Sequence, residues 1–205
     1  MNPISEQVVV IGAGMGGLAA AIRLAVAGQQ VTLFEAAAAP GGKMRTLPSD
    51  VGLVDAGPTV LTLRDVFDDL FALAGERLDD HLTLIPQPIL ARHWWPDGSR
   101  LDLFSDPAAS AAAIEAFAGR SEANGFMRFH AATAALYTAF EAPVMRAARP
   151  DIKAIVKAPI TSPSLWPALL PGVSLDRFIA RYFRDPRLRQ LFGRYATYVG
   201  GRPAQ

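Results

Sequence analysis

A glycine-rich turn near the start of the chain is the feature that most constrains its fold. Residues 8–11 form an uncharged, β-branched run, which predicts a fully buried strand of a parallel sheet. The next residues fit the pattern G-x-G-x-x-G: Gly12, Ala13, Gly14, Met15, Gly16 and Gly17. In this pattern the first glycine allows a tight turn, the second lets a phosphate approach the backbone, and the third lets a helix lie close to the sheet. The stretch therefore predicts a turn that binds a nucleotide.

The residues after the turn predict a complete strand–helix–strand unit. We expect a helix over residues 18–27, ended by Gly28, and a second strand over residues 31–34. Glu35 follows that strand, close to the spacing of about 20 residues at which an acid meets a ribose hydroxyl. Because its charge repels a ribose phosphate, the sequence favours an adenine dinucleotide other than NADP. The alternative is a glycine turn that binds nothing, since so short a pattern also arises by chance.

A second pair of glycines follows the acid, in Pro40-Gly41-Gly42-Lys43. Gly41 and Gly42 offer another place where a ligand can approach the backbone closely, and Lys43 and Arg45 supply cations for a pyrophosphate. Residues 53–60 are expected to form a closing strand that breaks at Gly57-Pro58, just before Thr59.

The order of these motifs resembles a known family. G-x-G-x-x-G, an acid, P-G-G-K and the D-A-G-P-T-V of residues 55–60 are together similar to the glycine-doublet flavoproteins, which include monoamine oxidases and carotenoid desaturases. The form D-A-G-P-T-V resembles the form that this motif takes in bacterial phytoene desaturases. Residues 91–99, A-R-H-W-W-P-D-G-S, and 191–203, L-F-G-R-Y-A-T-Y-V-G-G-R-P, resemble the hydroxyneurosporene (methoxyneurosporene) desaturase branch, also described as 1-hydroxycarotenoid 3,4-desaturases.

This resemblance implies an FAD-dependent enzyme. The expected reaction removes two hydrogens from an allylic C–C bond of an acyclic, 1-hydroxylated carotenoid. The alternatives are another glycine-doublet oxidase, such as an amine oxidase, and a nucleotide-binding fragment without activity, because members of the family are considerably longer. The expected FAD-binding residues are Gly12, Ala13, Gly14, Met15, Gly16, Gly17, Glu35, Gly41, Gly42, Lys43, Arg45, Gly57, Pro58 and Thr59. No catalytic residue is predicted.

The expected fold is α/β: a Rossmann-like FAD-binding βαβ unit with an inserted α+β substrate region, incomplete at its C-terminus. Residues 1–75 are assigned to the FAD-binding domain and residues 76–205 to a substrate- or membrane-facing region. Its expected elements are strands over 82–85, 89–95 and 101–104, the last two joined as a hairpin by the turn 96–99, and helices over 64–74, 107–117, 125–141, 174–183 and 185–198. Thr62 is expected to cap the first of these helices, and prolines to divide residues 143–171 into short pieces.

Composition excludes several classes of protein. The chain of 205 residues has no cysteine, so it has neither disulfides nor thiolate chemistry. Its net charge of +1 predicts no nucleic-acid partner. No apolar run approaches the roughly 18 residues of a membrane span, and no secretory signal is recognised. With the resemblance, this predicts a cytoplasmic protein, peripherally associated with the inner or photosynthetic membrane; the sequence does not indicate the oligomeric state.

Three further features have two interpretations each. His93 is either a substrate contact or a packed strand histidine, and Asp55 is either a general base or a structural hydrogen-bond acceptor. The apolar cluster of Leu165, Trp166, Leu169 and Leu170 is either core or a surface that enters the bilayer interface. The spacing of His81, His93 and His130 fits no metal motif.

Overall fold

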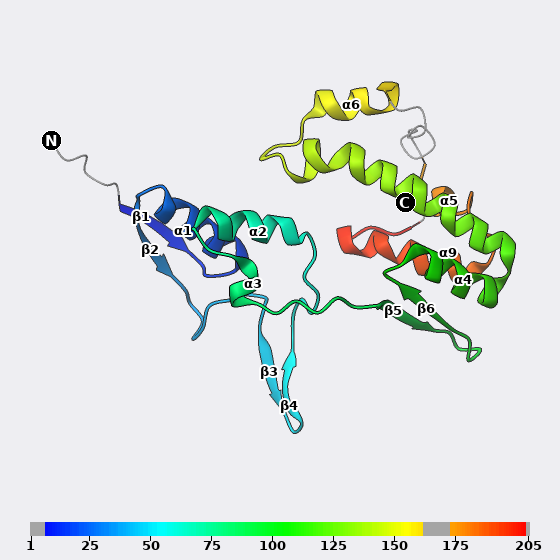
Figure 1. The fold of residues 1–205 in the computed structure, drawn as a ribbon, viewed down its shortest axis with the longest axis horizontal. Helices are drawn as coiled ribbons and strands as arrows, with labels where there is room; N and C mark the ends of the chain where they lie inside the picture. Colours follow the sequence, from blue (N-terminus) through cyan, green and yellow to red (C-terminus); the bar gives the residue numbers. More distant parts are fainter. Residues whose placement is uncertain (1–6, 162–172, 204–205) are drawn as a thin grey trace. The chain divides into compact units, whose positions relative to one another are not determined.

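A computed structural model describes residues 7–161 and 173–203 of the chain (Figure 1). The chain divides into two compact units, Met1–Ile85 and Pro86–Gln205, which we call the first and the second unit. This division falls ten residues after the boundary expected from the sequence, because helix α3 (Leu78–His81) packs on α2 (Arg64–Leu73) within the first unit. The predicted roles of the two regions, cofactor binding and substrate binding, are proposals that we take up below.

The first unit begins with the predicted strand–helix–strand element. Strands β1 (Gln7–Ile11) and β2 (Gln30–Phe34) are parallel, and α1 (Met15–Val26) connects them. The helix starts three residues earlier than expected because the turn of the motif is complete at Gly14. Gly28 ends the connection with a φ of +84°, a backbone conformation that a glycine adopts without steric strain.

The prediction that β1 is fully buried is wrong. Ile11 is 88% exposed and Val9 54% exposed. Among the described residues β1 pairs only with β2 and α1 covers a single face of this two-stranded sheet, so alternate side chains of β1 stay in contact with solvent.

The segment after the glycine pair forms a separate hairpin. Strands β3 (Thr46–Ser49) and β4 (Gly52–Asp55) pair with each other in antiparallel register and not with β1 or β2. Strand β3 was therefore not predicted, and the prediction of a closing strand over residues 53–60 is wrong beyond Asp55. Ser49 holds the turn, because its hydroxyl donates to the Gly52 carbonyl at 2.8 Å and accepts from the Val51 N–H at 3.3 Å.

Helix α2 confirms the predicted helix but not its cap. Thr62 does not cap it; the residue before the helix is Leu63, in the left-handed conformation at φ +54° and without a side-chain hydrogen bond to the first turn. Instead, the Arg64 guanidinium pairs with Asp68 at 3.1 Å and with Asp79 of α3 at 2.6 Å. The strand predicted over residues 82–85 is also wrong, because no strand lies beside this segment in the described chain.

The second unit contains the predicted hairpin of β5 (Ile89–Trp94) and β6 (Arg100–Phe104), followed by helices. The helical elements are α4 (Pro107–Ala118), α5 (Arg120–Phe140), the π-helix η1 (Glu141–Met145), α6 (Ile152–Thr161), α8 (Leu175–Ile179), α9 (Pro186–Gly193) and the 3₁₀-helix η3 (Arg194–Val199). Asp106 and Asp185 cap α4 and α9 with their carboxylates, as their Asp-Pro pairs indicate. Relative to the expected ranges, α5 begins five residues earlier and α8 ends at Ile179.

The core of the second unit joins the hairpin to the helices. Its buried side chains are Leu101, Leu103, Ile114, Ala123, Phe126, Ile179, Phe183, Leu188, Leu191 and Phe192. The hydroxyl of Ser110 on α4 accepts the Phe104 N–H and donates to the Phe104 carbonyl, which fixes the end of β6. The buried carboxylate of Glu122 accepts the Arg184 N–H at 3.2 Å, which holds the chain beyond α8 against α5.

Candidate cofactor site

The G-x-G-x-x-G turn brings a helix N-terminus to the carboxyl end of β1. Gly12 has a φ of +94°, and its N–H donates to the Phe34 carbonyl of β2 at 2.7 Å. Gly17 lies so close to the turn that a Cβ there would be 1.8 Å from the Gly12 carbonyl oxygen. The N–H groups of the first turn of α1 have no intrahelical acceptor, and that turn contains no acidic side chain, so it can bind an anion.

The second glycine pair contacts this turn through backbone atoms alone. The Gly41 N–H donates to the Ala13 carbonyl at 2.8 Å, and Gly14 and Gly41 form an isolated parallel bridge. A Cβ on Gly42, whose φ is +61°, would lie 3.0 Å from the Gly14 Cα. We call Gly14, Gly41 and Gly42 the glycine cradle. A side chain at Gly14 or Gly42 would enter the space between the two loops, and one at Gly41 would meet the Met44 carbonyl oxygen of its own loop, so the cradle leaves backbone exposed to a ligand.

A third segment, around Gly57, closes on the same loop. A Cβ on Gly57 would lie 1.9 Å from the Lys43 carbonyl oxygen, and the Ala56 N–H donates to the Arg45 carbonyl at 2.8 Å. The three motifs that the sequence analysis selected therefore meet within the first unit.

Glu35 binds the backbone on both sides of the site. Its carboxylate accepts the Ala13 N–H at 2.6 Å and the Ala37 N–H at 2.8 Å. Hydrogen bonds from the Ala37 and Ala13 N–H groups lower the pKa of Glu35, so the carboxylate is ionised at neutral pH. Two carboxylate oxygens offer about four acceptor positions, so room remains for ribose hydroxyls. That Glu35 also fixes the glycine turn was not predicted from the sequence.

These hydrogen bonds predict that the stability of the chain falls in acid, and that Glu35→Gln removes the part of this fall that Glu35 causes. Because the pKa of Glu35 is lowered on folding, its stabilising contribution is complete above the unfolded pKa of about 4.3 and is lost as the pH falls through the lowered value. The difference in Tm between the original chain and Glu35→Gln is therefore expected to be constant above about pH 5 and to shrink in more acidic solution. Thermal unfolding followed by circular dichroism between neutral and acidic pH measures this difference. A difference that does not change with pH would contradict the assignment.

Two cavities flank the glycine cradle. The larger, of about 990 Å³, is lined by seven of the predicted residues: Gly14, Met15, Gly41, Gly42, Lys43, Pro58 and Thr59. The smaller, of about 520 Å³, is lined by Gly42, Arg45, Asp55 and Pro58 among others. Six of the predicted residues line neither cavity: Gly12, Ala13, Gly16, Gly17, Glu35 and Gly57. All of these except Gly16 contact the loops that line the cavities or set the distance between those loops.

The larger cavity has an apolar wall that sequence reasoning missed. Val60, Leu61, Thr62, Leu63, Val66, Phe67, Phe71 and Leu82 line it. The apolar face of α2 is not fully buried, since Val66 on that face is 40% exposed. The signal was present in the apolar spacing of α2, but that spacing does not distinguish a core face from the wall of a cavity.

The residues present fit FAD. Bare backbone at the cradle and the N-terminus of α1 suit a pyrophosphate, and the exposed cations Lys43 and Arg45 have no ion pair among the described residues. The apolar wall suits the flat ring system of a flavin. Which of these residues hold the cofactor stays a prediction.

The other candidate residues are placed as follows. His93, in the second unit, is half-buried, and its Nε2 has no hydrogen-bond partner in the described chain. Burial and the nearby Arg194 guanidinium lower the pKa of His93, which favours the packed, neutral histidine. Asp55 is exposed and makes no side-chain hydrogen bond to any described residue. The interpretation of Asp55 as a structural hydrogen-bond acceptor therefore has no donor to support it among these residues. The cluster around Trp166 lies outside the described residues.

A βαβ unit with these glycine segments defines a class of nucleotide-binding protein, and comparison with known sequences identifies the family. The family described as flavin containing amine oxidoreductase matches residues 15–205, so the chain belongs to it. This confirms FAD as the cofactor and an α/β fold with mixed helix and strand content.

Several curated proteins that are similar to this chain are carotenoid enzymes. Hydroxyneurosporene desaturase of Cereibacter sphaeroides is 65% identical over 203 residues, which cover 99% of this chain and 41% of that protein. Hydroxyneurosporene desaturase of Rhodobacter capsulatus is 60% identical, over 96% of this chain and 40% of the relative. Phytoene dehydrogenase of Streptomyces griseus is 39% identical, over 98% of this chain and 39% of the relative. The resemblance to carotenoid desaturases is confirmed, and the chain spans about two fifths of the length of these relatives.

In the described residues no helix is both long and apolar enough to cross a bilayer. No three His, Asp or Glu side chains of the described chain gather where they would hold a metal ion.

Proposed function

We propose that this protein takes part in FAD-dependent desaturation of an acyclic, 1-hydroxylated carotenoid. The observation that carries the proposal is the 65% identity to a hydroxyneurosporene desaturase, which extends over 99% of the chain and therefore over both units. The proposed architecture is a Rossmann-like FAD unit followed by an inserted α+β region that receives the substrate. We further propose that the protein associates peripherally with a membrane, where a lipid-soluble polyene is dissolved.

The chemistry assigns different tasks to cofactor and protein. Removal of two hydrogens from a C–C bond needs a two-electron acceptor, which FAD supplies when bound. In our proposal the N–H groups of α1 and the side chains of Lys43 and Arg45 neutralise the pyrophosphate, Glu35 accepts ribose hydroxyls, and the glycine cradle lets the cofactor reach the backbone. The apolar wall from Val60 to Phe71 excludes water from the side of the cofactor that it contacts.

Anaerobic reduction of bound flavin tests the activity. The FAD-loaded chain is mixed without oxygen with vesicles containing 1-hydroxyneurosporene, and absorbance is recorded. We expect the oxidised flavin band to fade while the polyene band shifts to longer wavelength, because one more double bond joins the conjugated system.

The control separates this proposal from the amine-oxidase alternative. The same FAD-loaded chain is mixed with benzylamine in place of the polyene. Bleaching by benzylamine but not by the polyene would contradict the proposal in favour of an amine oxidase. Bound flavin that neither compound reduces would favour the alternative without activity.

A further inference from the structure

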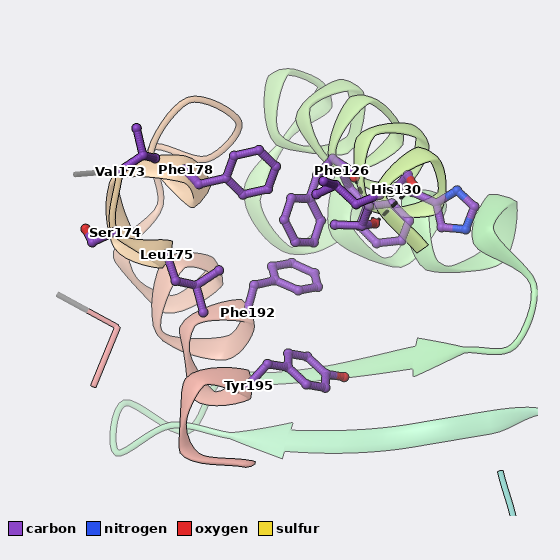
Figure 2. A pocket seen from close by; sticks show the side chains of 11 residues that line it. Phe126, His130, Val173, Ser174, Leu175, Phe178, Phe192 and Tyr195 are labelled. Carbon is purple, nitrogen blue, oxygen red and sulfur yellow. Dashed lines mark hydrogen bonds between the residues drawn. The ribbon is translucent and has the colours of Figure 1, made fainter. Parts of the chain in front are cut away.

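The second unit contains an apolar cavity that the cofactor chemistry does not use. It has a volume of about 540 Å³ and lies between α5, α8 and α9, as Figure 2 shows. This volume is within the range of about 300–1,000 Å³ that is typical of small-molecule sites. Six of its side chains carry rings: Phe126, Phe129, His130, Phe178, Phe192 and Tyr195. The cavity is therefore large enough for part of a ligand and is mostly aromatic.

The rings form a fixed wall. Phe126, Phe178 and Phe192 are each at most 7% exposed, and Phe126 and Phe192 belong to the core of the unit. Phe129 joins them, with its ring centroid 4.9 Å from that of Phe192 and 6.0 Å from that of Phe178. Side chains held by such contacts change conformation little, so the cavity presents preformed aromatic faces.

The polar groups of the cavity are few, and none is a carboxylate, a lysine or an arginine. The Thr133 hydroxyl donates to the Phe129 and His130 carbonyls of its own helix, and the Ser174 hydroxyl accepts the Arg177 N–H as a helix cap. The imidazole of His130 and the hydroxyl of Tyr195 remain, and neither has a hydrogen-bond partner among the described residues. In Figure 2 Val173 and Leu175 lie at one side of the cavity and His130 at the other.

We propose that this cavity binds one end of an acyclic conjugated hydrocarbon, with His130 and Tyr195 forming hydrogen bonds to a terminal hydroxyl. The identity of the ligand rests on the proposed function. An uncharged polyene needs no counter-ion and gains contact with the flat ring faces. A protonated amine fits less well, because the cavity offers no carboxylate and the Arg194 guanidinium already lies 5.2 Å from the Tyr195 ring centroid.

Filling the cavity tests the site. Thr133→Phe adds a ring inside the cavity, whereas Ala134→Phe adds the same ring at the next, exposed position of α5. Binding of 1-hydroxyneurosporene from detergent micelles is followed by the circular dichroism that a chiral site induces in the visible band of the achiral polyene. Thr133→Phe is expected to weaken binding at least about tenfold, and Ala134→Phe to change it less than about twofold.

The polar end is tested separately with His130→Phe and Tyr195→Phe, which keep the rings and remove the hydrogen-bonding atoms. Each is expected to reduce the preference for 1-hydroxyneurosporene over neurosporene about three- to tenfold, the effect of one lost hydrogen bond, while binding of neurosporene itself is unchanged. A purely structural role for these rings would weaken both polyenes equally and would overturn this part of the inference.

Two results would overturn the site while leaving the proposed function standing. One is unchanged polyene binding in Thr133→Phe together with normal flavin reduction. The other is displacement of the polyene from the micelle-treated protein by benzylamine. Conversely, Thr133→Phe could abolish polyene binding while the polyene fails to reduce the flavin of the original chain. That pair of results would support the site and contradict the proposed function.

Discussion

Gly17→Ala is expected to lower the free energy of unfolding of the first unit by about 3 kcal/mol and to abolish flavin retention. The added Cβ would lie 1.8 Å from the carbonyl oxygen and 3.0 Å from the carbonyl carbon of Gly12. Both are backbone atoms of the turn, so α1 must move away from β1. The intrinsic preference of alanine for helices, about 1 kcal/mol over glycine, offsets only part of this.

Gly16→Ala is the matched control for stability. Gly16 is the preceding residue of the same helix, and a Cβ there meets no atom within 4 Å. This variant is expected to be as stable as the original chain or more stable by up to about 1 kcal/mol. Urea unfolding of the two variants compares them directly, and equal midpoints for Gly17→Ala and Gly16→Ala would show that α1 does not lie against the turn as described.

Gly125→Ala is expected to destabilise the second unit by about 3 kcal/mol. A Cβ on Gly125 would lie 2.1 Å from the Tyr182 carbonyl oxygen, where α5 crosses the chain that follows α8. The same crossing is held by the Glu122 carboxylate, so it has little freedom to adjust. Urea unfolding followed by tryptophan fluorescence measures the loss, because Trp95 packs against the core of this unit.

Asn124→Ala is the control for Gly125→Ala. Asn124 is the exposed neighbour on the same helix and is expected to change stability by less than about 0.5 kcal/mol. A Gly125→Ala variant with the same unfolding midpoint as Asn124→Ala would contradict the close crossing of α5 and residue 182.

Local signals in the sequence were sufficient for the first βαβ element. The apolar run of β1, the spacing of Gly12, Gly14 and Gly17, and Gly28 each act within a few residues, and the structure contains the elements that they predict. The Asp-Pro pairs before α4 and α9 predicted those helix starts for the same reason: the capping carboxylate and the proline act on the adjacent turn.

Features that depend on a distant partner were predicted less well. Residues 82–85 have a strand-like composition but no neighbouring strand, and β3 was missed because its pairing with β4 places a proline, Pro48, within a strand. The cavity of the second unit combines rings from α5 with rings about 50 to 70 residues later, which no local pattern indicates. Leu63 shows the same limit, because leucine does not favour the left-handed backbone that it adopts there.

Titration of the 205-residue chain with FAD, with and without a side chain in the glycine cradle, tests the central claim most directly. Gly42→Ala puts a methyl group 3.0 Å from the Gly14 Cα, whereas Gly28→Ala imposes a similar left-handed strain at an open position distant from the cradle in sequence. Flavin retained after gel filtration is released by heat and quantified. We expect the original chain and Gly28→Ala to retain FAD and Gly42→Ala to bind it at least about tenfold more weakly. Equal retention by Gly42→Ala and Gly28→Ala, or none by the original chain, would contradict a cofactor site built on this cradle.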